Sequence, residues 1–262
     1  MNNKSTDKAL SSWQVANIRV TSFLSPDAST EGFDSWWQAA TNTPPENTSS
    51  NHQGQEKIAE GPYADGWLKV RFQPARIDWN FDSPPNKQLS EEGRETLGSY
   101  QTAIDVFYPL MKKWMNLDTY PSMQRLAFGI ELIEPTNSRE TGYERLKDYL
   151  SSVVAIDAEN SSDFSYKINR PRPSSVISEF KVNRLSIWST QRLESTLFSM
   201  PLGQQQQSRS VGKGPTHFYV RLALDINTDQ SYDGQFDAEH SILALDELLS
   251  FSKEIAMKGD IA

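Results

Sequence analysis

The chain contains no cysteine among its 262 residues. This absence excludes disulfide bridges, thiolate zinc sites, iron–sulfur clusters and cysteine nucleophiles. Histidine is scarce as well, because only His52, His217 and His240 are present, and none belongs to a zincin motif. No other catalytic signature is recognisable. We therefore expect no metal ion and no cofactor, and the sequence favours binding over catalysis.

Long apolar runs are also missing. Nowhere do 18 apolar residues follow one another, so no transmembrane helix is expected. Residues 1–12 are polar and lack the apolar core of a secretory signal, which predicts a disordered tail and a cytoplasmic protein. The net charge of −8 divides into −4 on each side of Pro121, so neither half has the basic surplus typical of nucleic-acid binding.

What the chain does contain is enough apolar material for a core. Hydrophobic residues make up 37% and aromatic residues 11% of the sequence, which predicts a single domain over residues 13–262. Several segments alternate apolar and polar residues with period two, most clearly between Phe218 and Ile226. Such alternation indicates a sheet with one buried and one solvated face. Strands are expected near residues 13–24, 67–73, 76–82, 124–133, 163–169, 181–191 and 217–226.

Helical spacing of apolar residues lies between these strands. A short helix is expected from Phe33 to Ala40, a longer one from Tyr100 to Trp114, a third around Tyr143 to Val153, and a last one over residues 237–257. Pro109 predicts a kink or break near Asp105. Two polar stretches, residues 41–65 and 200–215, are interpreted as long loops, the first of them mobile.

These elements predict an α+β fold: a mostly antiparallel sheet with the long helices packed on one face. The halves, about residues 13–121 and 122–262, share a similar order of elements. The first reads strand–helix–strand–strand–helix, and the second adds one strand. We therefore interpret the chain as a possible internal pseudo-duplication.

Several motifs occur in an order that resembles a known family. They are Gln73-Pro74-Ala75-Arg76, Trp79-Asn80, a helix from Tyr100 to Trp114, the strand Gln124-Arg125-Leu126-Ala127-Phe128-Gly129-Ile130, and Leu224-Asp225-Ile226-Asn227 before a leucine-rich helix. This arrangement resembles a sporadically distributed family of bacterial proteins of unknown function, over residues 14–257. The resemblance implies no catalytic residue and no cofactor.

The solvated sheet face is the most informative candidate surface. Parity places arginines and aromatic residues together on it, and such mixtures can anchor a protein partner or stack on bases. The alternative is an ordinary solvated face whose arginines pair with acidic neighbours. The predicted binding residues are Trp67, Lys69, Arg71, Arg76, Arg184, Trp188, Tyr219 and Arg221.

Three classes of function remain open. The first is a non-catalytic binding module that recognises a protein or peptide through the open sheet face. The second is a nucleic-acid-binding protein that uses the same face. The third is an enzyme or small-molecule binder with a pocket between the sheet and the long helix. The absence of a catalytic motif places the binding module first.

Overall fold

The computed structural model describes residues 10–29, 31–51, 53, 55–85, 93–150, 154–177, 180–199, 210–230, 232 and 234–260. For residues 195–199 and 210–213 the description covers the backbone alone. The predicted tail lies outside these residues except for positions 10–12, of which residues 10 and 11 are helical and residue 12 is a turn before the first strand. Residues 200–209, most of the second predicted loop, also lie outside them.

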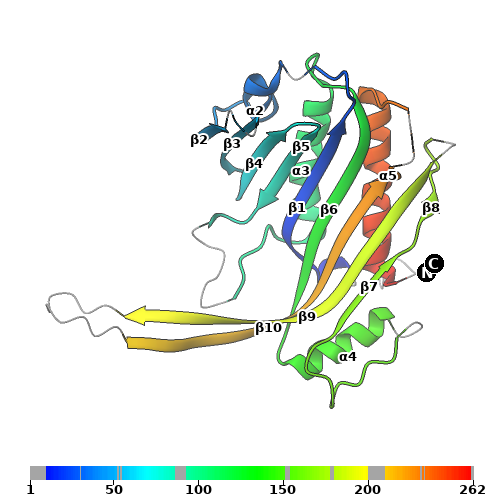
Figure 1. Ribbon diagram of the computed structural model, residues 1–262. Helices are drawn as coiled ribbons and strands as arrows, with labels where there is room; N and C mark the ends of the chain where they lie inside the picture. Colours follow the sequence, from blue (N-terminus) through cyan, green and yellow to red (C-terminus); the bar gives the residue numbers. More distant parts are fainter. Residues whose placement is uncertain are drawn as a thin grey trace, which may run out of the picture.

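One sheet of ten strands runs through the molecule (Figure 1). The strands are β1 (Gln14–Leu24), β2 (Asn47–Asn51), β3 (Glu56–Tyr63), β4 (Gly66–Gln73), β5 (Arg76–Asp82), β6 (Met123–Thr136), β7 (Ser165–Asn169), β8 (Arg172–Pro173), β9 (Lys181–Ser199) and β10 (Ser210–Thr228). Their order is β2-β3-β4-β5-β1-β6-β10-β9-β7, and β8 pairs with β9. Every strand pair among the described residues is antiparallel. The prediction of a mostly antiparallel α+β protein is confirmed.

The two halves of the chain occupy the two halves of this sheet. In each half the first strand, β1 or β6, is innermost, the last strand lies beside it, and earlier strands follow outward. The pairing of β1 with β6 joins the halves at the centre. Each half therefore arranges its strands by the same rule.

Among the described residues, four helices of nine residues or more accompany the sheet: α2 (Phe33–Thr41), α3 (Tyr100–Met115), α4 (Arg139–Leu150) and α5 (Ala238–Lys258). Helix α3 begins at Ser99, whose hydroxyl accepts from the backbone N–H of Thr102 at 3.2 Å. Helix α5 begins after Asp237, whose carboxylate accepts from the backbone N–H of His240 at 2.8 Å. Both are N-caps that satisfy otherwise unpaired amides.

Of the kink or break expected near Asp105, the break is wrong, because α3 is helical throughout Tyr100–Met115 with Pro109 inside it. The side chains on both sides of the proline, including Phe107, Leu110 and Met111, are buried in the core. Packing of that face stabilises the helix against the loss of one backbone hydrogen bond.

The prediction of a mobile loop over residues 41–65 is also wrong, since β2 and β3 form a hairpin there and β3 pairs with β4. The segment is polar because β2 is an edge strand, exposed at all its residues. Its neighbour β3 buries only the small residues Ala59 and Gly61. Alternation of large apolar residues is therefore absent, although the backbone pairing is regular.

The two faces of the sheet differ sharply in composition. We call covered face the side whose residues join the helices in one core, and open face the opposite side. Register assigns Ile18, Val20, Phe128, Ile130 and Leu224 to the covered face, where they pack with helical residues in a single cluster. Helices α3 and α5 lie behind the sheet in the view of Figure 1.

Strands β9 and β10 extend beyond the rest of the sheet. The last residue of β9 paired with β7 is Ser189, and β10 pairs with β6 only from Phe218 onward. Residues 193–199 and 210–217 are paired with each other alone among the described strands. At about 3.3 Å per residue this two-stranded arm is about 23 Å long. Figure 1 shows it projecting away from the body of the molecule.

Candidate functional site

Six of the eight predicted binding residues lie on the open face, and five of these six have partly exposed side chains. These five are half-buried and come from β4, β5 and β10: Trp67, Lys69, Arg71, Arg76 and Arg221. Register places Lys69 opposite Asn80 and Arg71 opposite Asp78, so the solvated row on β4 and β5 is as predicted.

Trp188 and Arg184 were assigned to the wrong face. In the register of β9 with β10, Trp188 lies opposite Leu222 and Arg184 opposite Ile226, which are covered-face residues. Trp188 is 0% and Arg184 2% exposed. The face was predicted wrongly because Leu185 and Ile187 lie on the opposite face of β9 from Trp188, so both faces of this strand carry apolar residues.

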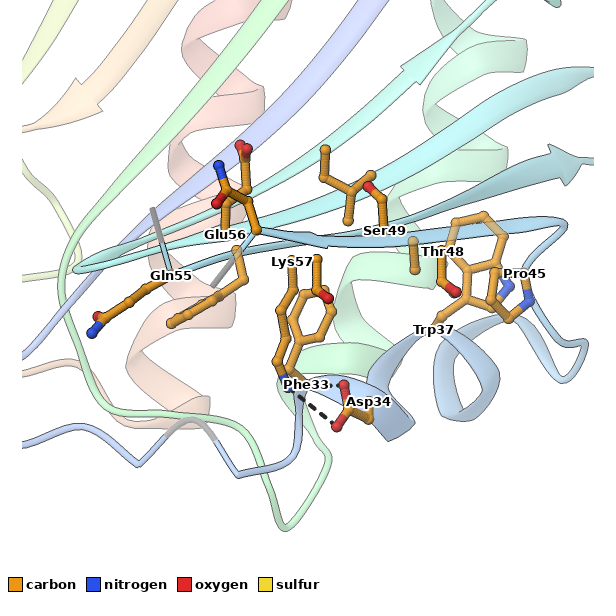
Figure 2. Close-up of a pocket in the computed structure, with 14 residues that line it drawn as sticks. Phe33, Asp34, Trp37, Pro45, Thr48, Ser49, Gln55, Glu56 and Lys57 are labelled. Atoms are coloured by element: carbon orange, nitrogen blue, oxygen red, sulfur yellow. Dashed lines mark hydrogen bonds and ion pairs between the residues drawn. The ribbon is translucent and has the colours of Figure 1, made fainter. Parts of the chain in front are cut away.

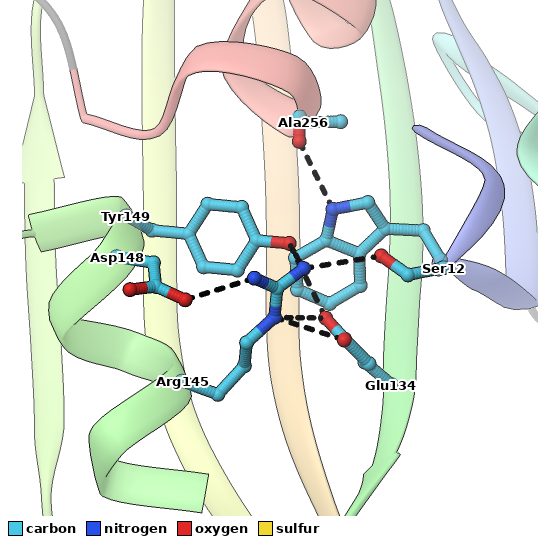
Figure 3. A network of polar contacts seen from close by, with 7 residues as sticks. Ser12, Glu134, Arg145, Asp148, Tyr149 and Ala256 are labelled. Carbon is cyan, nitrogen blue, oxygen red and sulfur yellow. Dashed lines mark hydrogen bonds and ion pairs between the residues drawn. The ribbon is translucent and has the colours of Figure 1, made fainter. Parts of the chain in front are cut away.

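Trp188 belongs to an aromatic cluster that fixes α4 to the sheet. Its ring stacks on Tyr149 at 5.3 Å and lies 6.3 Å from Trp13. Beside this cluster, Arg145 donates to both carboxylate oxygens of Glu134 at 2.9 and 3.0 Å, as Figure 3 shows. Because Arg145 and Glu134 hydrogen-bond to each other, we assign this arrangement a structural role.

Tyr219 is on the open face but is only 4% exposed. Its hydroxyl accepts from the backbone N–H of Arg94 at 2.8 Å, and its ring packs with Ala16 and Ile133. The chain around Gly93 and Arg94 thus covers this end of the open face, which the spacing of apolar residues did not indicate.

Charges on the rest of the open face neutralise one another. The ion pairs join Arg19 to Asp225, Lys69 to Glu60, Arg71 to Glu56, Arg76 to Asp78, and both Arg94 and Arg221 to Glu131. Burial opposes ionisation of Glu131, but the two arginines outweigh it and hold its pKa below the usual value. A phosphate would have to compete with these carboxylates for each cation. The observed ion pairs match the alternative stated in the sequence analysis, in which the arginines of a solvated face pair with acidic neighbours.

A different hollow lies where helix α2 faces the hairpin β2–β3. Phe33 and Trp37 are buried on the helix face that meets the sheet. Phe33 lies 5.9 Å from Phe72 of β4, so aromatic rings join the helix to the third strand from the edge. The small residues of β2 leave the space between helix and hairpin unfilled.

The resulting groove has a volume of about 710 Å³ (Figure 2). It is lined by Phe33, Asp34, Trp37, Pro45, Thr48, Ser49, Ser50, Asn51, Gln55, Glu56, Lys57, Ile58, Ala59 and Phe72. Lys57 donates to Asp34 at 3.0 Å across it and lies 5.6 Å from the ring of Phe33. An apolar floor with polar groups at the rim is typical of ligand sites of this size.

The groove adjoins an edge of the sheet. Strand β2 pairs with β3 on one side, and no other described strand pairs with it. An edge strand presents backbone donors and acceptors to a further strand. Thr48 and Ser50 lie on the same side of the hairpin as Ala59 and Lys57, so a strand added to β2 could direct alternate side chains toward the groove.

Two smaller hollows are present. One, of about 590 Å³, lies between α5 and residues 172–176, and the other, of about 360 Å³, lies at the base of the arm beside His217. Among the described residues no three histidine, cysteine, aspartate or glutamate side chains gather as a metal site. Of the helices in that part of the chain, none combines the length and hydropathy needed to cross a membrane.

Comparison with protein-family models, with curated proteins and with solved structures finds no match to this chain.

Proposed function

We propose that the protein is a non-catalytic binding module that recognises an extended peptide segment of a protein partner. The observation that carries the proposal is the 710 Å³ groove beside the edge of β2. In such complexes the backbone of the peptide pairs with the edge strand, while pockets select its alternate side chains. The aromatic floor favours a segment with a large apolar side chain.

The place of binding therefore differs from the one expected from the sequence. The open face offers charges that are already paired, whereas the groove offers buried aromatic surface and an unused strand edge. The same pairing argues against the nucleic-acid alternative, because release of counterions by free cations supplies most of that affinity. An enzyme is less supported, since among the described residues that line the groove no hydroxyl nucleophile is hydrogen-bonded to a base.

Internal duplication is supported by the strand order. In each half a helix follows the innermost strand, α2 after β1 and α4 after β6, and a longer helix closes the half. Helix α4 contacts β6, β9 and β10 through buried residues such as Tyr143 and Leu146, whereas α2 leaves the groove open. Under this proposal the groove is where the two halves have diverged.

The test compares two serines on the two outer strands of the sheet. Ser50 of β2 faces the groove, in register with Lys57, and Ser165 of β7 is exposed at the opposite edge of the sheet and does not line the groove. A library of random peptides displayed on phage is selected against the wild-type protein. Enriched peptides should bind Ser165→Trp with unchanged affinity, and Ser50→Trp should weaken their binding at least tenfold by filling the groove.

One further variant separates the groove from the open face. Trp67, Arg71 and Arg221, replaced together by alanine, should leave binding of the selected peptides unchanged. Loss of binding in this triple variant with full binding by Ser50→Trp would return the site to the open face. Failure to enrich any peptide would overturn the proposal.

A further inference from the structure

The outer edges of β9 and β10 in the arm differ strongly in how well they are protected against pairing with a further strand. Residues 210–217 of β10 include Gly212, Gly214 and Pro215, and the register with β9 shifts between Lys213 and Thr216. Proline, glycine and bulges are devices that stop further strand pairing. Residues 190–199 of β9 contain neither proline nor glycine, and β9 carries no extra residue in that register.

The orientation of the β9 backbone follows from its paired part. Arg184 accepts from the N–H of Arg170 and donates its own N–H to Asn169, both on the β7 side. Lys181 accepts from Asp229, on the β10 side. In an antiparallel ladder the backbone N–H and C=O groups of successive residues point to alternate sides of the strand. The N–H and C=O groups of even-numbered residues of β9 therefore point away from β10. Arg192 and Glu194 thus direct their amides to the edge that lacks a strand among the described residues.

The side chains at this edge are complementary to themselves. Arg192 and Glu194 lie on one side of the strand, are paired with each other, and their side chains are 61% and 44% exposed. When two copies of a strand pair antiparallel about a two-fold axis at Leu193, Arg192 of each copy lies opposite Glu194 of the other. An axis at Glu194 would instead bring two glutamates together, which is unfavourable.

We propose that a second copy of this chain pairs with β9, residues 190–196 of one copy aligning with residues 196–190 of the other. The stretch is limited on one side by Ser189, which β7 already occupies. Since the contact is isologous, it closes as a dimer and leaves no open end for a filament. It also gives a third and fourth strand to an arm that is marginal as an isolated ribbon. The proposal does not depend on the peptide groove.

The first test removes one outward donor. Glu194→Pro deletes an N–H that the pairing with β10 does not use, so the arm is retained while the edge is blocked. By sedimentation equilibrium the wild-type protein should have twice the mass of one chain. The variant should dissociate with a constant raised at least tenfold and an unchanged circular dichroism spectrum. A monomeric wild type, or a variant that dimerises equally well, would overturn the proposal.

A second test reports on the register. Because the chain has no cysteine, an introduced one is the only thiol. Leu193→Cys should form a disulfide-linked dimer on mild oxidation, since directly opposed residues in such a pair bring their Cβ atoms within about 5.5 Å. Lys253→Cys, exposed on α5, is the control and should stay monomeric under denaturing electrophoresis. Equal cross-linking of both variants would contradict the proposed pairing, and Ser50→Trp should dimerise like the wild type.

Discussion

The covered and open faces of one sheet use the same strands for opposite purposes. On β10, Leu222 and Leu224 are buried among helical residues, while the alternate residues Arg221 and Asp225 pair with neighbours across the open face. On β5, Trp79 is buried next to Trp114, whereas Asp78 accepts from Thr21 and Arg76. The covered face supplies stability by burial of apolar area, and on the open face the charged side chains pair with one another. Interaction sites are therefore expected where neither arrangement is complete, at the edges of the sheet.

The strongest way to break this comparison is to place a charge on the covered face. Leu224→Asp should unfold the protein or drive it into aggregates, because an uncompensated carboxylate in the core costs several kcal/mol, about as much as the whole stability of a domain. Arg221→Ala, three residues away on the open face, should have a free energy of unfolding within about 1 kcal/mol of the wild-type value. Urea denaturation followed by tryptophan fluorescence measures both, and a reversed order would mean that the register is wrong.

Two tryptophans sharpen the same contrast. Trp188→Ala should lower the free energy of unfolding by about 3–5 kcal/mol, because it leaves a cavity beside Tyr149 and Trp13. Trp67→Ala, on the open face, should cost no more than about 1 kcal/mol. Equal losses in thermal melts of the two variants would contradict the assignment of Trp188 to the covered face.

A carboxylate at the end of α5 tests the comparison through pH. Asp260 is buried and accepts from Arg170 at 2.6 and 2.9 Å and from Tyr166 at 3.0 Å. The hydrogen bonds from Arg170 hold the pKa of Asp260 below its usual value. Ionised Asp260 therefore stabilises the fold above its unfolded pKa near 3.9, and this stabilisation is lost as pH falls through the lower folded pKa.

Asp260→Asn should accordingly cost about 1–3 kcal/mol at pH 7, with a difference from the wild type that shrinks below about pH 4. Asp225→Asn is the control, since its partner Arg19 is 3.4 Å away and both side chains are partly exposed. The same pH dependence of the free energy of unfolding in both variants between pH 2 and 7 would contradict the stabilisation that we assign to ionised Asp260.

The smallest effect belongs to the ion pairs of the open face. Arg71→Ala should change the free energy of unfolding by less than about 1 kcal/mol, because its pair with Glu56 is partly exposed. The difference should shrink further in 1 M salt, which screens such pairs. A loss above about 2 kcal/mol in urea melts would show that the open face carries stability after all.

The sequence predicted most elements with large alternating side chains, and it failed where that contrast was weak. Helix α5 is close to its expected bounds, and β10 ends close to the expected residue, because apolar residues recur there at the right period. Strand β10 begins at Ser210, however, so the predicted loop over residues 200–215 is wrong for its last six residues, which lack alternating large apolar side chains. Strands β2 and β3 were missed because β2 is an exposed edge strand of polar residues and β3 buries only Ala59 and Gly61, so neither strand alternates large apolar residues. The parity of β9 was inverted because Leu185 and Ile187 compete with Trp188 as candidates for the core.

The candidate site was harder to predict for the same reason. The groove depends on what the small residues of β2 leave unfilled, and a void has no pattern in the sequence. The extension of β9 and β10 beyond their neighbours depends on where β6 and β7 stop pairing, which is a property of the assembled sheet. The resemblance to a bacterial family remains a prediction.

The claim that a partner segment binds at the edge of β2 is tested most directly by hydrogen exchange. Amides of the protein alone and with a selected peptide are compared by mass spectrometry. We predict slowed exchange in residues 47–51, the strand that would gain a neighbour, with little change in β4, β5 and β10. Protection confined to β4, β5 and β10, with residues 47–51 exchanging as before, would contradict the account.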